Sequence, residues 1–238
     1  MLRKFIAVFI LSASMLLQAS PVPLHAYDLQ PEGLVRGAVP AGMIPIKPFA
    51  QADFSRSGSL ESLELARGRL TIMSAGKPVW QSPPAWTVVQ AQITDLNRDG
   101  VPEATLLVWR PFQPWPVDRW LPHGGRIAGF HDEKGNSCHI ILIGWRGSGY
   151  GELWAGSALA EPVRSFAVAD LNGDHAQELV TLEGTYAQSW TFLAAPAHAI
   201  KVWEWNGFGF SVVSRLVGTF DKMALVQAMD GRILILVP

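Results

Sequence analysis

A nine-residue acidic segment occurs three times in this chain of 238 residues, and it constrains the fold more than any other feature. The second copy is Asp95-Leu-Asn-Arg-Asp-Gly-Val-Pro-Glu103, and the third is Asp170-Leu-Asn-Gly-Asp-His-Ala-Gln-Glu178. The first copy, Asp53-Phe-Ser-Arg-Ser-Gly-Ser-Leu-Glu61, keeps the two outer acids but has serine at its third and fifth positions. A repeat of this kind indicates a chain built from several copies of one structural unit.

Apolar, strand-like stretches surround these segments in the same order each time. They precede the second and third copies at residues 86–94 and 163–169, and they follow them at 104–110 and 179–183. Residues 140–145 and 199–205 are further apolar runs that end in tryptophan, and a glycine-containing turn and another apolar stretch follow each. The unit therefore consists of a strand, an acidic loop, a strand, a longer connection, a strand, a glycine turn and a strand.

Four-stranded units of about 40–50 residues in series are typical of propeller blades. We predict an all-β, β-propeller-like fold over residues 46–238, with about four blades of four antiparallel strands each. One unit carries an insertion at 111–129 that is rich in Pro, Trp and Gly. Residues 27–45 form an N-terminal extension that either closes the propeller by pairing with the C-terminal strands or leaves an open fragment.

The composition excludes two broad classes of protein. Hydrophobic residues make up 49% of the chain and charged residues only 16%, which is incompatible with intrinsic disorder. The formal net charge of −1 provides no positive field for nucleic acid. The 22 glycines and 17 prolines fit many short strands joined by turns.

The N-terminus has the pattern of a secretory signal peptide. Arg3 and Lys4 precede an apolar run at residues 5–17, which is followed by small residues and prolines. We predict a signal peptide at residues 1–26 with cleavage after Ala26; the alternative is an uncleaved membrane anchor. Both interpretations place the remaining chain outside the cytoplasm, secreted or extracytoplasmic. Cys138 is the single cysteine, so no disulfide within the chain is possible.

The acidic segments have the residue pattern of a calcium loop. Positions 1, 3 and 5 of a tight turn place side-chain oxygens on one concave side, the carbonyl of position 7 joins them, and the glutamate at position 9 returns from the next strand. Gly100 allows the positive φ angle that such a reversal needs. Oxygen ligands at this density favour Ca²⁺. The predicted ligands are Asp95, Asn97, Asp99, Val101 and Glu103 in the second segment, and Asp170, Asn172, Asp174, Ala176 and Glu178 in the third.

The acidic segments have two other possible interpretations, an EF-hand loop and a simple β-turn. An EF-hand loop requires an acidic residue at position 12 and flanking helices, whereas Leu106 and Thr181 occupy that position within strand-like runs. The sequence therefore excludes an EF-hand. Alternatively, the carboxylates hold a β-turn by bonding to their own backbone, as Asp and Asn commonly do.

With these loops the chain resembles the FG-GAP or VCBS-type repeats of integrin-like β-propellers, whose calcium loop reads Asp-x-Asp/Asn-x-Asp-Gly-x-x-Asp/Glu. Segment 95–103 matches every ligand position, and segment 170–178 matches except that His175 replaces the glycine. The resemblance implies structural calcium in a loop between the first two strands of a blade. Segment 53–61, with Ser55 and Ser57 in place of stronger donors, is expected to hold no ion.

No catalytic group stands out in the sequence. It contains no Gly-x-Ser-x-Gly motif, and no spacing singles out two of its glutamates as glycosidase acids. His131, Cys138 and His139 could hold a transition metal on a hairpin, but ordinary polar hairpin residues are the simpler interpretation. Tryptophans such as Trp115 and Trp120 in the insertion either form a binding platform or cap the core.

We therefore expect an exported, calcium-binding module for binding or adhesion, with a protein or carbohydrate partner and no enzymatic activity. An extracellular hydrolase or lyase that uses one face of the propeller is the alternative. A periplasmic assembly partner without a small ligand is a third hypothesis. Nucleic acid is not an expected partner, and a membrane is one only if the N-terminal segment stays uncleaved.

Overall fold

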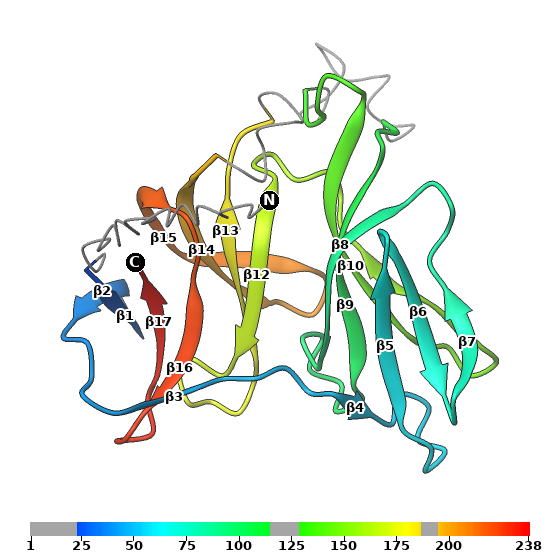
Figure 1. Ribbon diagram of the computed structural model, residues 1–238, viewed down its shortest axis with the longest axis horizontal. Coiled ribbons are helices and arrows are strands. Elements are labelled where there is room, and N and C mark those ends of the chain that lie inside the picture. Colours follow the sequence, from blue (N-terminus) through cyan, green and yellow to red (C-terminus); the bar gives the residue numbers. More distant parts are fainter. Residues whose placement is uncertain (1–22, 115–128, 187–194) are drawn as a thin grey trace, which may run out of the picture.

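The computed structural model describes residues 23–114, 129–186 and 195–238, and these ranges contain strands and turns but no helix (Figure 1). The prediction of an all-β propeller with four blades is thereby confirmed. Residues 1–22 of the predicted signal peptide and residues 115–128 of the predicted insertion lie outside the described ranges.

Three blades are simple antiparallel meanders. Blade 1 contains β4 (Gln51–Ala52), β5 (Glu61–Ala66), β6 (Arg69–Ser74) and β7 (Lys77–Gln81). Blade 2 contains β8 (Thr87–Thr94), β9 (Glu103–Pro111), β10 (Asn136–Trp145) and β11 (Tyr150–Ala155). Blade 3 contains β12 (Val163–Ala169), β13 (Glu178–Glu183), β14 (Ala197–Trp205) and β15 (Phe210–Phe220). Each apolar stretch predicted to be a strand falls in one of them.

Blade 4 combines both ends of the chain. Its strand order is β2 (Gly33–Gly37), β1 (His25–Gln30), β17 (Ile233–Val237), β16 (Ala224–Ala228) and β3 (Met43–Pro45). The N-terminal extension therefore pairs with the C-terminal strands, through β1 with β17 and β3 with β16. Ala26 is buried and pairs with Leu236, so the predicted cleavage point after Ala26 lies inside β1 and stays a prediction.

The middle strands are apolar because neighbouring blades cover both of their faces. In β9 the six residues 103–108 are all buried, and in β10 the eight residues 137–144 are buried. The outer strand β7, by contrast, is mostly exposed. Continuous apolar runs of this length are typical of strands buried on both sides.

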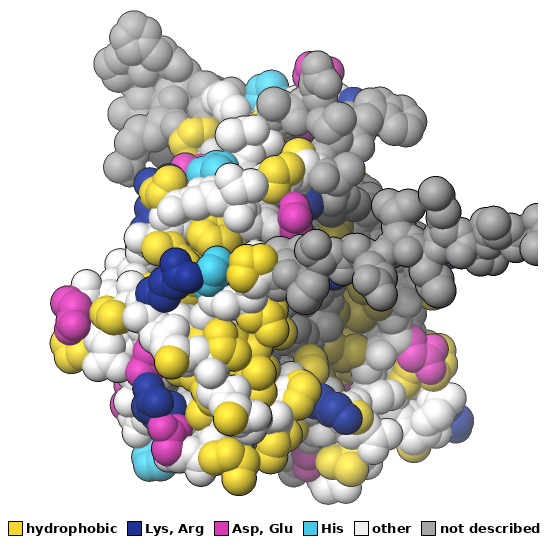
Figure 2. All heavy atoms as spheres, turned by 60° about the vertical axis from the view of Figure 1, so that its left-hand side comes forward, with side chains coloured by type: hydrophobic (Ala, Val, Ile, Leu, Met, Phe, Trp, Pro, Cys, Tyr) yellow, Lys and Arg dark blue, Asp and Glu magenta, His cyan; other side chains and the backbone are white. Residues whose placement is uncertain are grey.

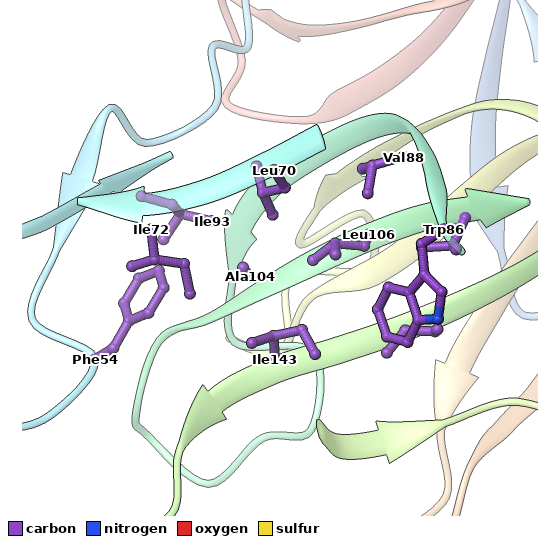
Figure 3. Close-up of a cluster of buried hydrophobic side chains, with 11 residues drawn as sticks. Phe54, Leu70, Ile72, Trp86, Val88, Ile93, Ala104, Leu106 and Ile143 are labelled. Atoms are coloured by element: carbon purple, nitrogen blue, oxygen red, sulfur yellow. The ribbon is translucent and has the colours of Figure 1, made fainter. Parts of the chain in front are cut away.

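The hydrophobic core lies between the blades. One cluster joins blades 1 and 2: Phe54 and Ile72 lie at one end, Trp86 and Val88 at the other, and Leu106 between them (Figure 3). A second cluster joins blades 2 and 3, and a third joins blades 3 and 4. The clusters follow the order of the blades, which runs from blade 4 on the left of Figure 1 to blade 1 on the right.

The segment between β3 and β4 links blade 4 to blade 1. It crosses the lower part of the molecule in Figure 1, and its Phe49 forms a β-bridge with Ile93 of blade 2. Phe49 is 64% exposed. The connection between blade 4 and blade 1 is thus an extended segment that carries an exposed aromatic side chain.

Candidate metal centre

The three acidic segments form loops at equivalent places in consecutive blades. The first loop (residues 53–61) lies between β4 and β5, the second loop (residues 95–103) between β8 and β9, and the third loop (residues 170–178) between β12 and β13. Each connects the first two strands of its blade, which is where the sequence resemblance placed calcium loops.

All three loops share one backbone conformation, with left-handed residues at positions 4 and 6. The φ angles are 55° and 84° at Arg56 and Gly58, 60° and 74° at Arg98 and Gly100, and 79° and 68° at Gly173 and His175. His175 thus takes the conformation of the glycine it replaces, and the glycine of the third loop occupies the other left-handed position. The sequence indicated the left-handed residue at position 6 and missed the one at position 4.

The glutamate at position 9 closes each loop over a buried apolar side chain. Its carboxylate accepts the backbone N–H of position 2, at 2.8 Å from Phe54, 2.8 Å from Leu96 and 2.7 Å from Leu171. These three apolar residues are 0–6% exposed, and the three glutamates are 0–1% exposed. Sequence reasoning overlooked position 2, although an apolar residue occupies it in every copy.

The second loop contains two buried oxygens without a hydrogen-bond partner. Glu103 Oε1 accepts the Leu96 N–H and the Thr94 hydroxyl, whereas Glu103 Oε2 has no partner. Asp95 Oδ1 also has none. Nearby, Asp99 accepts the Val101 N–H at 2.8 Å and bonds to Asn97. A buried charged oxygen without a partner is costly and indicates a missing positive group.

The pKa of the position 9 glutamate is raised in both the second and the third loop, mainly by burial. Burial, with smaller contributions from the charges of Asp95 and Asp99, raises the pKa of Glu103 to about 8, and burial raises the pKa of Glu178 to about 7. Burial and the charge of Asp99 also raise the pKa of Asp95. A cation among these oxygens would favour their ionised forms.

In the third loop, each corresponding oxygen has a partner. Asp170 accepts the backbone N–H of Gly173 at 2.7 Å and of His175 at 2.9 Å, one on each oxygen. Glu178 accepts the N–H of Leu171 on Oε2, and its Oε1 forms an ion pair with Arg98 Nη2 at 3.3 Å. The positive partner of Glu178 therefore comes from the second loop, in the neighbouring blade.

The first loop is satisfied by uncharged groups. Asp53 accepts the N–H groups of Ser57 and Gly58. Glu61 Oε1 accepts the Ser74 hydroxyl at 3.1 Å, while its Oε2 accepts the Phe54 N–H. This arrangement fits the expectation that the first loop holds no ion, which stays a prediction.

Calcium binding itself also stays a prediction. Within the described parts of the chain, no three His, Cys, Asp or Glu side chains gather as a ready metal site. The predicted ligands instead hold the loop backbone, as in the β-turn alternative. The fit of the second loop to a cation depends on the two unpartnered oxygens, and the structure provides no such atoms in the first and third loops.

The other candidates from the sequence do not form a common site. His131 contacts the Asp132 carbonyl and the ring of Phe112, whereas His139 bonds to Ser137 and Gly156. Cys138 is fully buried, and burial raises the pKa of its thiol to about 12. The predicted binding platform at Trp115 and Trp120 lies outside the described residues.

Glu161, in the connection between β11 and β12, and Glu183 of β13 lie close together. Glu161 and Glu183 each contact Lys201 Nζ at 2.6 Å. Although burial opposes it, the contacts of Glu161 with Lys201 and His198 lower its pKa to about 2, whereas burial raises the pKa of Glu183. Both carboxylates are thus engaged in a charge network rather than directed at an open site.

A cleft of about 530 Å³ lies beside the third loop, between blades 3 and 4. Its polar walls include Asp28, Asn172, Glu204 and Arg232, and Leu29 and Val213 add apolar surface. In the described residues no helix is long and apolar enough to cross a membrane.

No protein-family model matches the chain, and no curated protein matches its sequence. The fold and the loops together define it as a four-bladed β-propeller with three equivalent acidic loops.

Proposed function

We propose that this protein is an exported, calcium-binding β-propeller of the FG-GAP/VCBS type that binds a protein or carbohydrate partner. Calcium is held by the second loop and has a structural role. The observation that carries this proposal is the pair of buried, unpartnered oxygens, Asp95 Oδ1 and Glu103 Oε2. Asn97, Asp99 and the Val101 carbonyl supply further oxygens in the same loop, so the donor set suits a hard cation.

A structural role follows from the position of the loop. Glu103 is 0% exposed, and its loop joins the first two strands of blade 2. The Asp95 N–H donates to Gln177 Oε1 of blade 3 at 2.8 Å, so a cation here would also stabilise the contact between two blades.

The surface supports the binding of a partner. The cleft beside the third loop offers carboxylates, an amide and a guanidinium, which are groups that bind sugar hydroxyls or a polar peptide. Apolar side chains gather on the face that carries blade 4 (Figure 2). Val35 of β2 and Val217 of β15 are 41% and 67% exposed on neighbouring strands.

The enzymatic alternative has less support. The glutamates with a raised pKa are buried, and they bond either to their own loop backbone or to Lys201. All three are at most 1% exposed, so a substrate at the surface does not reach them.

Thermal unfolding with and without calcium tests the proposal. A ligand present at about ten times its Kd adds about 1.4 kcal/mol to the free energy of unfolding, so millimolar Ca²⁺ should raise Tm by about 2–6 °C in a chain of this size. EDTA should reverse the shift, and Mg²⁺ should produce a smaller one because it requires tighter octahedral geometry. Ser55→Ala in the first loop is the control and should keep the shift. If Ca²⁺ does not change the Tm of wild type, the proposed calcium site in the second loop is ruled out.

The partner is tested separately, with soluble oligosaccharides and peptides as probes. Glu204→Ala should weaken a ligand that binds in the cleft and should leave the calcium shift unchanged.

A further inference from the structure

We propose that Arg98 takes the place of a metal ion in the third loop, so that the protein binds one calcium ion, in the second loop, and not two. The inference rests on the proposed function only for the ion in the second loop. It assigns Arg98 as the residue that determines how many of the similar loops bind metal.

The three equivalent glutamates provide the first argument. Each uses one carboxylate oxygen to accept the N–H of position 2, and in the second loop this oxygen also accepts the Thr94 hydroxyl. The comparison that matters for a cation is at the other oxygen. That oxygen meets the Ser74 hydroxyl in the first loop, no partner in the second, and the Arg98 guanidinium in the third. Only the second loop therefore lacks a donor at the position where a cation would bind.

The aspartates at position 1 show the same difference. Both oxygens of Asp53 and both oxygens of Asp170 accept backbone N–H groups of their own loops. Asp95 Oδ1 is buried and accepts no hydrogen bond. Two independent positions thus distinguish the second loop from the others.

Arg98 is well placed to act as a fixed cation. Its side chain is 28% exposed and reaches from the second loop to Glu178, which is fully buried. The adjacent residue, Gln177, accepts the Asp95 N–H, so two hydrogen bonds, both donated by the second loop, tie the two loops together. A guanidinium supplies a permanent charge and several N–H donors, which satisfies a carboxylate without a metal.

Arg56 provides an internal comparison. It occupies position 4 of the first loop, as Arg98 does in the second, and both have a left-handed backbone. Among the described residues, however, no ion pair joins Arg56 to Glu103, whereas Arg98 pairs with Glu178. An arginine at position 4 is therefore not sufficient to replace a metal ion in the next loop. Its side chain must also reach the glutamate of the neighbouring blade.

The experiment is a calorimetric titration of the purified protein with Ca²⁺ alone, using matched substitutions. Asp99→Asn and Asp174→Asn change position 5 of the second and third loops. Both aspartates are exposed, and both accept the N–H of position 7 at 2.8 Å, a bond that asparagine can keep. Arg98→Gln removes the proposed internal cation, and Arg56→Gln is its control.

Wild type should bind one ion, Asp99→Asn should weaken that binding at least tenfold, and Asp174→Asn and Arg56→Gln should leave it unchanged. Arg98→Gln should bind a second ion, which Asp174→Asn should abolish in that background. If wild type binds two ions and Asp174→Asn binds only one, the inference is wrong. The proposed function remains consistent with that result.

Other outcomes separate the two proposals. One ion in Arg98→Gln, located in the second loop, would also overturn the inference. If wild type binds no ion, Arg98→Gln binds one, and Asp174→Asn abolishes that binding, the role of Arg98 is supported. The proposed calcium site in the second loop is then refuted. Absence of binding in both proteins refutes both. If Arg98→Gln fails to fold, the number of ions bound by wild type, Asp99→Asn and Asp174→Asn still tests whether the third loop binds metal.

Discussion

At the residue scale, Glu61, Glu103 and Glu178 are equivalent in backbone position and burial but differ in one neighbour each. Burying an ionised carboxylate costs several kcal/mol unless a donor or a cation compensates for it. The second carboxylate oxygen meets a hydroxyl in the first loop and a guanidinium in the third. In the second loop the Thr94 hydroxyl bonds to the oxygen that already accepts a backbone N–H, and the other oxygen has no partner. Small changes at a conserved backbone geometry thus give repeated loops different chemical properties.

Glu103→Gln should abolish the calcium-dependent rise in Tm, because the neutral amide no longer attracts the cation. Glu61→Gln is the matched control at the same position of the first loop and should keep the full shift. Differential scanning calorimetry with Ca²⁺ and with EDTA measures both. An undiminished calcium shift in Glu103→Gln would contradict the assignment.

His139 makes stability depend on pH. It is 5% exposed, and burial together with the charge of Arg110 lowers its pKa from 6.5 to about 4. The unfolded chain therefore binds more protons than the folded protein between these values, and the free energy of unfolding falls as pH decreases through this window. The loss reaches about 3 kcal/mol below pH 4.

His139→Asn keeps a donor near the Gly156 carbonyl but does not titrate. Urea unfolding of wild type and His139→Asn at several values from pH 7 to pH 4 should therefore give curves that converge toward acid. Parallel pH profiles would show that His139 does not carry the effect.

At the element scale, each acidic loop is anchored by the apolar side chain at position 2. Leu96→Ala should reduce the free energy of unfolding by about 2–4 kcal/mol, because Leu96 is fully buried in the cluster between blades 2 and 3. Leu60→Ala is the control at a leucine that is 56% exposed and should change stability by less than about 0.5 kcal/mol. Chemical denaturation measures both, and equal effects would refute the anchoring role.

The sequence predicted the elements better than the contacts between them. The apolar runs before and after each acidic segment became β8, β9, β12 and β13, since periodicity and length identify strands. The pairing of Arg98 with Glu178 could not be predicted, because it depends on how far apart two blades lie. The start of β1 at His25 was also missed, since the small residues there have the pattern of a cleavage site.

At the scale of the whole molecule, blade 4 is the part that depends on both ends of the chain. Residues 234–237 of β17 are all buried, between β1 and β16. Burial of one such aliphatic side chain contributes about 1.5–3 kcal/mol, so the four together are comparable with the total stability of a typical domain, about 5–15 kcal/mol.

Truncation after Asp230 should therefore release β1 and β2 as well as β16. Hydrogen exchange should show rapid exchange at residues 25–37, which are almost 200 residues away in sequence from the cut. Removal of Pro238 alone is the control and should leave their protection intact. Persistent protection of β1 in the truncated chain would show that β17 does not hold it.

The make-up of blade 4 also determines the order in which the blades can fold. Among the described strands, a ribosome makes β1 and β2 first, yet β17, which must lie beside β1, comes last. Blades 1, 2 and 3 each consist of consecutive strands and can form as the chain emerges, since domains and their parts fold as they become available. Blade 4 has to wait for β17, so the nascent chain carries the β1–β2 hairpin without its neighbouring strand until β17 has been made. Synthesis of β17 is thus the event that completes blade 4.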